Sequence, residues 1–159
     1  MTATELKWTN LPGPLVNFKT QEYMYTSIGN FIIHEEEFKD FVVVDEHIAD
    51  VVMRCNSHGI KTYFCCVGHA IDEVFVDGCE SPSYSSAYIV FEQKPVIKQM
   101  FINSKYWQFS ECKAGFDQLP GYAIHIKRHD TFKDWAKAMK ELQYKFSFLT
   151  NEFRQLLSY

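Results

Sequence analysis

The chain has 159 residues, of which 47% are hydrophobic and 16% aromatic, and its formal net charge is −4. A chain of this length can bury most of its apolar surface around one core without disulfides or structural metal, and its composition is far from that of a disordered segment. No apolar run approaches the roughly 20 residues of a membrane-spanning helix, and the N-terminus lacks the pattern of a secretory signal. We therefore expect a cytoplasmic protein without a membrane partner.

Charge is distributed unevenly along the chain. Residues 1–92 carry 5 Lys or Arg against 14 Asp or Glu, whereas residues 93–159 carry 11 against 6, so the two parts have net charges of −9 and +5. Such an asymmetry can steer an anionic ligand or a nucleic acid to the C-terminal part, or can pair two copies of the chain in a homo-oligomer. It is equally compatible with two parts that offset each other within one fold.

The N-terminal part opens with an irregular segment. Prolines and a glycine interrupt the stretch Asn10-Leu11-Pro12-Gly13-Pro14, so residues 1–20 are predicted to form an irregular arm ahead of a single domain over residues 21–159. Two runs rich in β-branched and aromatic residues, 30–34 and 38–44, then predict a β-hairpin.

A helix is predicted to follow, with Asp45 as its cap and Gly59 at its left-handed C-terminal position. Its apolar residues recur at the i, i+3, i+4 and i+7 positions of one buried face: Ile48, Val51, Val52 and Cys55. Residues 60–66 then alternate as a strand does, and Gly68 ends that run.

A long polar segment separates this strand from the next one. Residues from Ala70 to Ser85 are rich in Asp, Gly, Ser and Pro, and loops longer than about 12 to 15 residues are usually lids or binding loops. We therefore expect a lid here, after which residues 87–91 resume the sheet.

The C-terminal part alternates helices and strands. Pro95 predicts the first turn of a helix that ends near Asn103. Two strands are predicted at residues 106–112 and 122–127, joined by a turn through Leu119-Pro120-Gly121.

The last predicted helix begins at Thr131, which can act as its N-cap, and its apolar pattern continues through Leu149 to Leu156. The order of elements predicts an α+β fold: a mainly antiparallel sheet with about three helices packed on one face, in a single domain.

Two Cys-x-x-His pairs, Cys55 to His58 and Cys66 to His69, raise the hypothesis of a zinc site, because thiolate and imidazole are the preferred ligands of zinc. Cys79 and His125 are alternative ligands. Against a four-ligand site, Cys55 fits the buried face of its helix, where a small thiol is a common core residue. Five cysteines in a reducing compartment fit thiols, ligands or nucleophiles better than a disulfide framework.

Cysteine catalysis is a second hypothesis for the same loop. Cys66 near His69 resembles a thiolate activated by an imidazole at the end of a strand. Cys65 and Cys66 must point to opposite faces of the strand, so one of the two belongs to the core. A thiol among apolar neighbours is inert.

Ligand binding is a third hypothesis. Gly68 lets the backbone turn sharply and direct its N–H groups toward an anion such as phosphate. His69, together with Tyr63 or Tyr88 as a stacking ring, suits a nucleotide-like ligand. A plain structural turn explains the same glycine.

Basic residues form a further candidate surface, which can bind nucleic acid or can simply be the solvated side of an amphipathic helix. They lie in and just before the last predicted helix: Lys127, Arg128, Lys133, Lys137 and Lys140.

The stretch from Asn56 to His69, followed by Tyr88-Ile89-Val90-Phe91, resembles small, mostly uncharacterised proteins of bacteriophages and prophages over about 40 residues. Their pattern is a helix ending in Asn-x-x-Gly, then Thr-x-x-Ser/Cys-Cys-x-Gly-His, then Tyr-Ile-x-Phe. The resemblance implies a phage-type accessory protein in the host cytoplasm, with a counter-defence role. It places the signature at four positions: Thr62, Cys66, Gly68 and His69.

A fainter similarity is to the wybutosine-synthesis methyltransferases that act on transfer RNA, which place a Ser-Cys-Ser-Gly-Arg loop after a helix and a strand. His69 stands in place of that arginine, and the chain is shorter, which argues against methyl transfer from S-adenosylmethionine.

Together these patterns predict a protein that binds a small anionic, nucleotide-like ligand or a host protein. The predicted binding residues are Thr62, Tyr63, Cys66, Gly68, His69 and Tyr88, and a zinc ion, if bound, would be held by Cys66 and His69. The alternative is a metal- or cysteine-dependent hydrolase, or an RNA-modifying enzyme, that uses the same loop.

Overall fold

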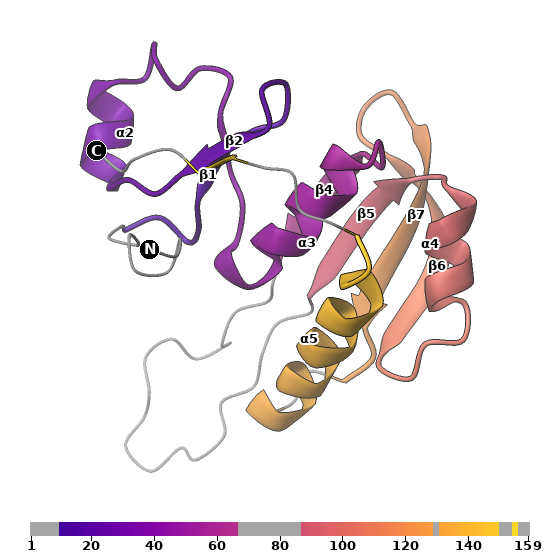
Figure 1. Cartoon of the computed structure of the whole chain (residues 1–159). Coiled ribbons are helices and arrows are strands. Elements are labelled where there is room, and N and C mark those ends of the chain that lie inside the picture. Colours follow the sequence, from indigo (N-terminus) through magenta and orange to yellow (C-terminus); the bar gives the residue numbers. More distant parts are fainter. Residues whose placement is uncertain (1–9, 67–86, 129–130, 150–153, 156–159) are drawn as a thin grey trace. The chain divides into compact units, whose positions relative to one another are not determined.

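A computed structural model describes residues 10–66, 87–128, 131–149 and 154–155 (Figure 1). The chain is an α+β domain, as the order of its elements predicts. Its residues cluster into two compact units, one of residues 1–59 with 149–159 and the other of residues 60–148. Among the helices in the described ranges, none combines the length and the apolar character that crossing a membrane requires.

The first unit contains a small four-stranded sheet. Its strands occur in the order β3 (Val42–Val43), β1 (Leu15–Asn17), β2 (Glu22–Met24) and β8 (Arg154–Gln155). β1 is antiparallel to both of its neighbours, whereas β2 and β8 run parallel. A local core forms beside these strands from three buried side chains: Leu15, Met24 and Phe38.

The start of this unit differs from the sequence prediction. β1 lies inside the segment 1–20 that was expected to be an irregular arm. Its pairing with β2 satisfies the backbone N–H and C=O groups there, and such long-range pairing outweighs the local effect of nearby prolines.

The predicted hairpin over residues 30–44 is wrong. Its first half is helix α2 (Ile28–Ile33), and only Val42–Val43 of its second half is strand. Ser27 caps α2 by accepting a hydrogen bond from the Asn30 N–H at 3.3 Å. Phe31 stacks on Phe38 with ring centroids 6.1 Å apart. Capping and aromatic packing therefore override the β-propensity of the isoleucines.

The helix predicted after Asp45 is confirmed as α3 (Glu46–Ser57), and Gly59 follows it with a φ of 77° in the left-handed region. Near its start, the Tyr25 hydroxyl donates to the Glu46 carboxylate at 3.0 Å. Burial, together with the negative charge and hydrogen bond of Glu46, raises the pKa of Tyr25. This contact ties the segment after β2 to the first turn of α3.

The second unit is built on a four-stranded antiparallel sheet. Its strands lie in the order β4 (Thr62–Cys66), β5 (Tyr88–Glu92), β7 (Leu119–Ile126) and β6 (Trp107–Ala114). All four predicted strands of this part are confirmed.

The predicted turn at Leu119-Pro120-Gly121 is wrong, because these residues belong to β7. The chain reverses earlier, between Gly115 and Gln118, which have φ values of 70° and 51°. A turn with left-handed residues matches the twist of paired strands, so Gly115 specifies the reversal more strongly than the later proline and glycine do.

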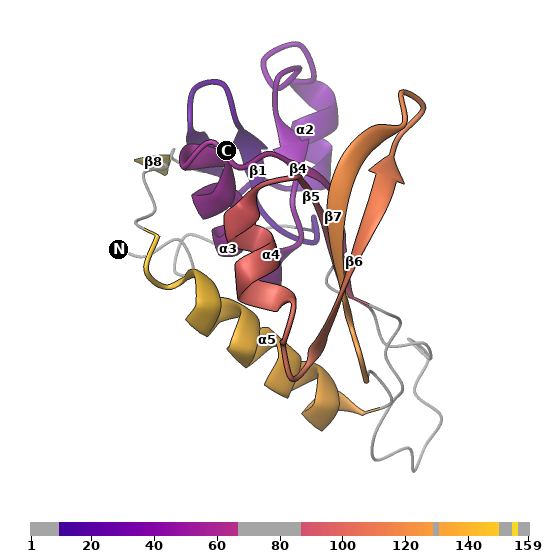
Figure 2. The same ribbon diagram turned by 90° about the vertical axis from the view of Figure 1, so that its right-hand side faces the viewer.

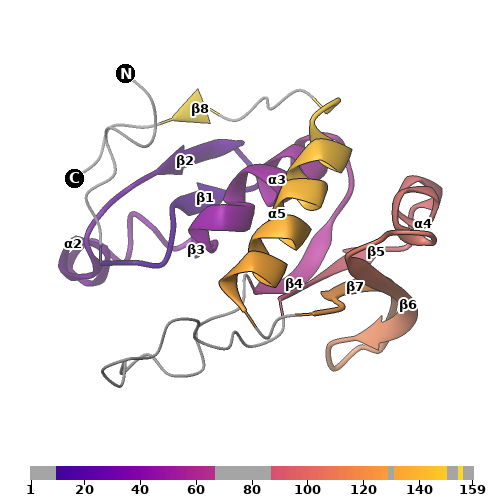
Figure 3. The same cartoon turned by 90° about the horizontal axis from the view of Figure 1, so that it is seen from below.

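Helices α4 (Pro95–Phe101) and α5 (Phe132–Phe146) cover the same face of this sheet (Figures 2 and 3). The Phe146 ring lies 6.1 Å from that of Phe91 on β5 and 5.8 Å from that of Phe101 on α4. The indole Nε1 of Trp107 donates to the carbonyl of Ala138 at 2.8 Å. These contacts fix α5 on β5 and β6.

The two ends of α5 show one confirmed and one wrong prediction. Thr131 is the N-cap, and its hydroxyl accepts from the Asp134 N–H at 3.2 Å. The helix ends at Phe146 rather than continuing toward Leu156, and residues 154–155 form β8. The backbone of residues 154–155 pairs with β2 in the sheet, and this long-range pairing overrides a local periodicity that fits a helix.

Candidate functional site

The clearest candidate site is a basic pocket of about 360 Å³ in the second unit. In the part of the chain that the structure describes, its lining residues are four cations, one tyrosine and one aspartate. They are Lys105, Tyr106, Lys127, Arg128, Asp134 and Lys137.

Strand pairing brings two segments of this basic pocket together. Lys105 and Tyr106 directly precede β6, and Lys127 and Arg128 directly follow β7. The Lys127 N–H donates to the Tyr106 carbonyl at 2.9 Å, which continues the antiparallel ladder by one residue pair. Residues that are about 20 positions apart in sequence are therefore held side by side at one end of the sheet.

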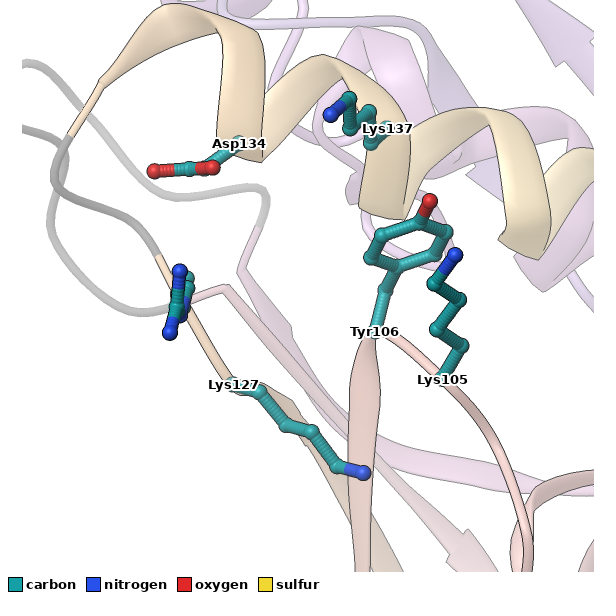
Figure 4. Close-up of a pocket in the computed structure, with 6 residues that line it drawn as sticks. Lys105, Tyr106, Lys127, Asp134 and Lys137 are labelled. Atoms are coloured by element: carbon teal, nitrogen blue, oxygen red, sulfur yellow. The ribbon is translucent and has the colours of Figure 1, made fainter.

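The first two turns of α5 supply a further wall of the basic pocket (Figure 4). Asp134 lies in the first turn and Lys137 in the next, and the ring of Tyr106 points its hydroxyl toward this helix. The Thr131 hydroxyl also donates to the Asp134 carboxylate at 3.2 Å. The cap thus orients the carboxylate that lines the pocket on α5.

Two further contacts position the cationic side chains. Lys127 Nζ donates to the Ser104 carbonyl at 2.8 Å, and Lys105 Nζ lies 5.3 Å from the centroid of the Tyr106 ring. Glu141, the nearby acid of α5, accepts hydrogen bonds from the Ser104 hydroxyl and the Tyr106 N–H. Glu141 is engaged in these hydrogen bonds, and among the residues that the structure describes, four cations and one carboxylate line the pocket.

This arrangement suits an anion with several oxygen atoms. A guanidinium group offers a planar set of donors that matches phosphate, and ammonium groups add point charges around it. Partial enclosure strengthens these interactions relative to those of cations on a flat surface. The basic pocket is therefore chemically suited to a phosphate-bearing ligand.

A second feature of this unit is the sheet face that α4 and α5 do not cover. Ile89 lies opposite Ile124, and both are fully buried on the helix side. Their neighbours along the strands point to the other side, because side chains alternate between the two faces. Cross-strand pairing places four such residues in one row: Cys66, Tyr88, His125 and Gln108.

The next row on the face opposite α4 and α5 runs from Phe64 on β4 through Val90 and Ala123 to Ser110. Phe64 is 50% exposed, and Tyr88 in the neighbouring row is 39% exposed. A hollow of about 560 Å³ extends beyond Phe64 to the turn after β6, where Phe116 is fully exposed. We call this surface the aromatic sheet face; its exposed rings are Phe64, Tyr88 and Phe116.

The residues predicted to bind a ligand separate into three groups. Cys66 and Tyr88 are paired neighbours on the aromatic sheet face. Thr62 lies opposite Phe91 at the other end of β4, and Tyr63 occupies a register shift between Thr62 and Phe64, so neither adjoins Cys66.

Gly68, His69 and the proposed lid from Ala70 to Ser85 lie outside the described residues. The binding, catalytic and metal roles assigned to this loop therefore stay predictions.

The cysteines behave differently from one another. Cys55 is fully buried on α3, and burial raises the pKa of its thiol to about 12, which opposes its use as a thiolate ligand. Cys65 lies opposite Ile89 and Cys66 opposite Tyr88, so the two thiols point to opposite faces, as predicted. Within the residues that the structure describes, no three His, Cys, Asp or Glu side chains form a metal-binding group.

Thiol labelling at pH 8 is expected to distinguish these cysteines. Cys66, which is partly exposed, should react with iodoacetamide in the folded protein, whereas Cys55 should react only after denaturation, because its thiol is buried and protonated. Mass spectrometry of peptides from folded and denatured samples measures both. Equal labelling of the two residues in the folded protein would contradict the buried position of Cys55.

The residues of the predicted basic surface separate into two groups. Lys127, Arg128 and Lys137 line the basic pocket, whereas Lys133 and Lys140 are exposed on α5 without lining it. Sequence reasoning missed Lys105, Tyr106 and Asp134. A signal for the first two was present, since antiparallel pairing of the two predicted strands places the start of one beside the end of the other.

The chain matches no protein-family model, and searches of curated proteins and of solved structures find no significant match. The function is therefore inferred from the geometry of the chain itself.

Proposed function

We propose that this protein binds a phosphate-bearing, nucleotide-like ligand in its basic pocket. The single observation that supports this most strongly is the convergence of four cations on one cavity, in which Asp134 is the one carboxylate among the described lining residues. The cations are Lys105, Lys127, Arg128 and Lys137. The chain as a whole is acidic, so this concentration of positive charge is a local feature of the site.

The size and lining of the basic pocket suit a group of about the size of one nucleotide. Its volume of about 360 Å³ lies at the lower end of the range typical of small-molecule sites. Tyr106 supplies an aromatic ring beside the cations, and a ring of this kind can pack against a base or a sugar while the cations bind phosphate.

In this proposal the protein is a phage-type accessory protein that acts in the host cytoplasm. It binds a nucleotide-like ligand there in order to counter a host defence. The loop with Cys66, Gly68 and His69 is proposed to contribute to the same ligand. Cys66 ends β4 and Tyr88 begins β5, at the end of the sheet where the residues of the basic pocket also lie.

A thermal-shift and calorimetry series tests the proposal with ATP, GTP, pyrophosphate and adenosine as probes. We expect ATP at a hundredfold excess over its Kd to stabilise the protein by about 2.7 kcal/mol, and adenosine, which lacks phosphate, to have no effect. The double variant Arg128→Glu, Lys137→Glu should bind ATP at least about tenfold more weakly, which corresponds to about 1.4 kcal/mol.

The matched control is Lys98→Glu, Lys113→Glu, which makes the same change of net charge at two exposed lysines of the same unit outside the pocket. This control should bind ATP within about twofold of the unmodified protein. Equal losses in both double variants, or stabilisation by adenosine alone, would show that the basic pocket is not the binding site.

A further inference from the structure

We infer that the ligand of this protein is a single-stranded nucleic acid, which lies across the aromatic sheet face with its bases on Phe64 and Tyr88 and its phosphates in the basic pocket. The inference rests on the proposed function and deepens it, because it names the polymer to which the bound phosphates belong. Three observations lead to it.

The first is the arrangement of the exposed rings. Phe64 pairs with Val90, and Tyr88 lies two residues from Val90 on β5, so Phe64 and Tyr88 are diagonal neighbours on one face. Diagonal cross-strand neighbours lie about 7 to 8 Å apart, within reach of aromatic side chains. Two exposed rings on adjacent strands form a platform on which successive bases of a flexible strand can stack, whatever their sequence.

The second is the continuity between this platform and the positive charge. Tyr88 pairs with His125 on β7, and Lys127 follows His125 by two residues. Two residues of extended chain span about 7 Å. A nucleic-acid strand with one base on the Tyr88 ring therefore has only a short distance to cross before its next phosphate reaches Lys127. Lys127 therefore flanks the platform at one end of the sheet, and the other cations of the basic pocket line the same cavity as Lys127.

The third is the polar character of the row that joins them. His125 and Gln108 are exposed on the same face as Tyr88 and offer donors and acceptors to the edges of unpaired bases. A purely apolar face would favour a protein partner. Exposed rings, polar side chains and flanking cations together match the chemistry of bases joined by phosphates.

Fluorescence anisotropy with labelled oligonucleotides of about 12 nucleotides tests the inference. The probes are poly-uridine RNA, poly-thymidine DNA and a duplex of the same length. We expect the protein to bind at least one single strand about tenfold more tightly than the duplex, because the bases of a duplex are not free to stack on the rings.

The aromatic variants give the decisive measurement. Phe64→Ala and Tyr88→Ala should each weaken binding of the single strand about tenfold, whereas Tyr88→Phe, which keeps the ring, should stay within about twofold of the unmodified protein. The matched control is Phe148→Ala, since Phe148 is a comparably exposed ring of the same unit that follows α5. It should bind normally.

Salt dependence tests the phosphate contacts separately. Arg128→Gln should lower the slope of log affinity against log salt concentration by about 0.7, the value expected for one lost phosphate contact with a single strand. Lys98→Gln, outside the basic pocket, should leave the slope unchanged.

The outcomes separate this inference from the proposed function. If ATP binds in the basic pocket but the oligonucleotides do not, or bind equally well to Phe64→Ala and Tyr88→Ala, the inference is wrong and the proposed function stands. If neither ATP nor any oligonucleotide binds, both are wrong. If the two alanine variants instead turn a dimer into a monomer without changing oligonucleotide binding, the aromatic sheet face is a self-association surface and the inference fails.

Discussion

Replacing Phe146 with alanine is expected to lower the free energy of unfolding of the unit of residues 60–148 by about 4 kcal/mol. Phe146 is fully buried, and its ring packs against Phe91 on β5 and Phe101 on α4. The variant loses the transfer free energy of an aromatic side chain and leaves a cavity that these two rings cannot fill without leaving their own positions.

The same substitution bears on the candidate site. Phe146 holds the end of α5 on the sheet, and the start of α5 carries Asp134 and Lys137 into the basic pocket. Because one rigid helix links the two ends, we expect Phe146→Ala also to weaken ATP binding at temperatures where the unit remains folded.

Urea unfolding followed by tryptophan fluorescence measures the effect of Phe146→Ala, since Trp107 and Trp135 both lie in this unit. Phe148→Ala is the matched control, because Phe148 is 64% exposed and lies only two residues further along the chain. Its unfolding free energy should change by no more than about 0.5 kcal/mol. Similar losses in both variants would contradict the packing of Phe146 between the two rings.

Replacing Gly13 with alanine is expected to lower the stability of the first unit by about 3 kcal/mol. A Cβ atom at this position would overlap the carbonyl oxygen of Val44 and would lie 2.6 Å from the amide nitrogen of Glu46. Both neighbours are backbone atoms of residues whose N–H groups are hydrogen-bonded: the Val44 N–H donates to the Pro14 carbonyl at 3.1 Å and the Glu46 N–H to the Pro12 carbonyl at 2.9 Å. Relief of the overlap must therefore disrupt the start of α3.

Circular dichroism during thermal unfolding measures the effect of Gly13→Ala, and Gly29→Ala is its control. Gly29 lies in α2 with open space around the position of a Cβ atom, and alanine is the better helix former, so this variant should be as stable as the unmodified protein or slightly more so. An unchanged melting temperature for Gly13→Ala would contradict the close approach of the Gly13 segment to the residues before α3.

Elements with local signals were predicted well. The apolar spacing of α3 and the glycine after it, the proline at the start of α4 and the threonine cap of α5 each act within one or two turns of the helix. Signals of this kind are readable because the interacting groups are close in sequence.

The wrong predictions have a common cause in long-range packing. Residues 28–33 contain isoleucines that favour strands, but the Ser27 cap and the packing of Phe31 on Phe38 stabilise a helix. Residues 154–155 continue a helical pattern, but pair with β2 across more than 100 positions of sequence. Periodicity does not report interactions over such separations.

The sequence by itself determined the α+β class, most elements of the second unit and the excess of positive charge in the C-terminal part, because propensity, capping and composition are local properties. Only the tertiary structure decided that β7 lies between β5 and β6. This order brings Lys105, Lys127 and Lys137 around one cavity. It also places Tyr88 and His125 in one row on the face opposite α4 and α5. The physical reason is that strand order and register depend on backbone hydrogen bonds between distant segments and on the burial of one face of the sheet against α4 and α5. No single stretch of residues encodes either of these interactions.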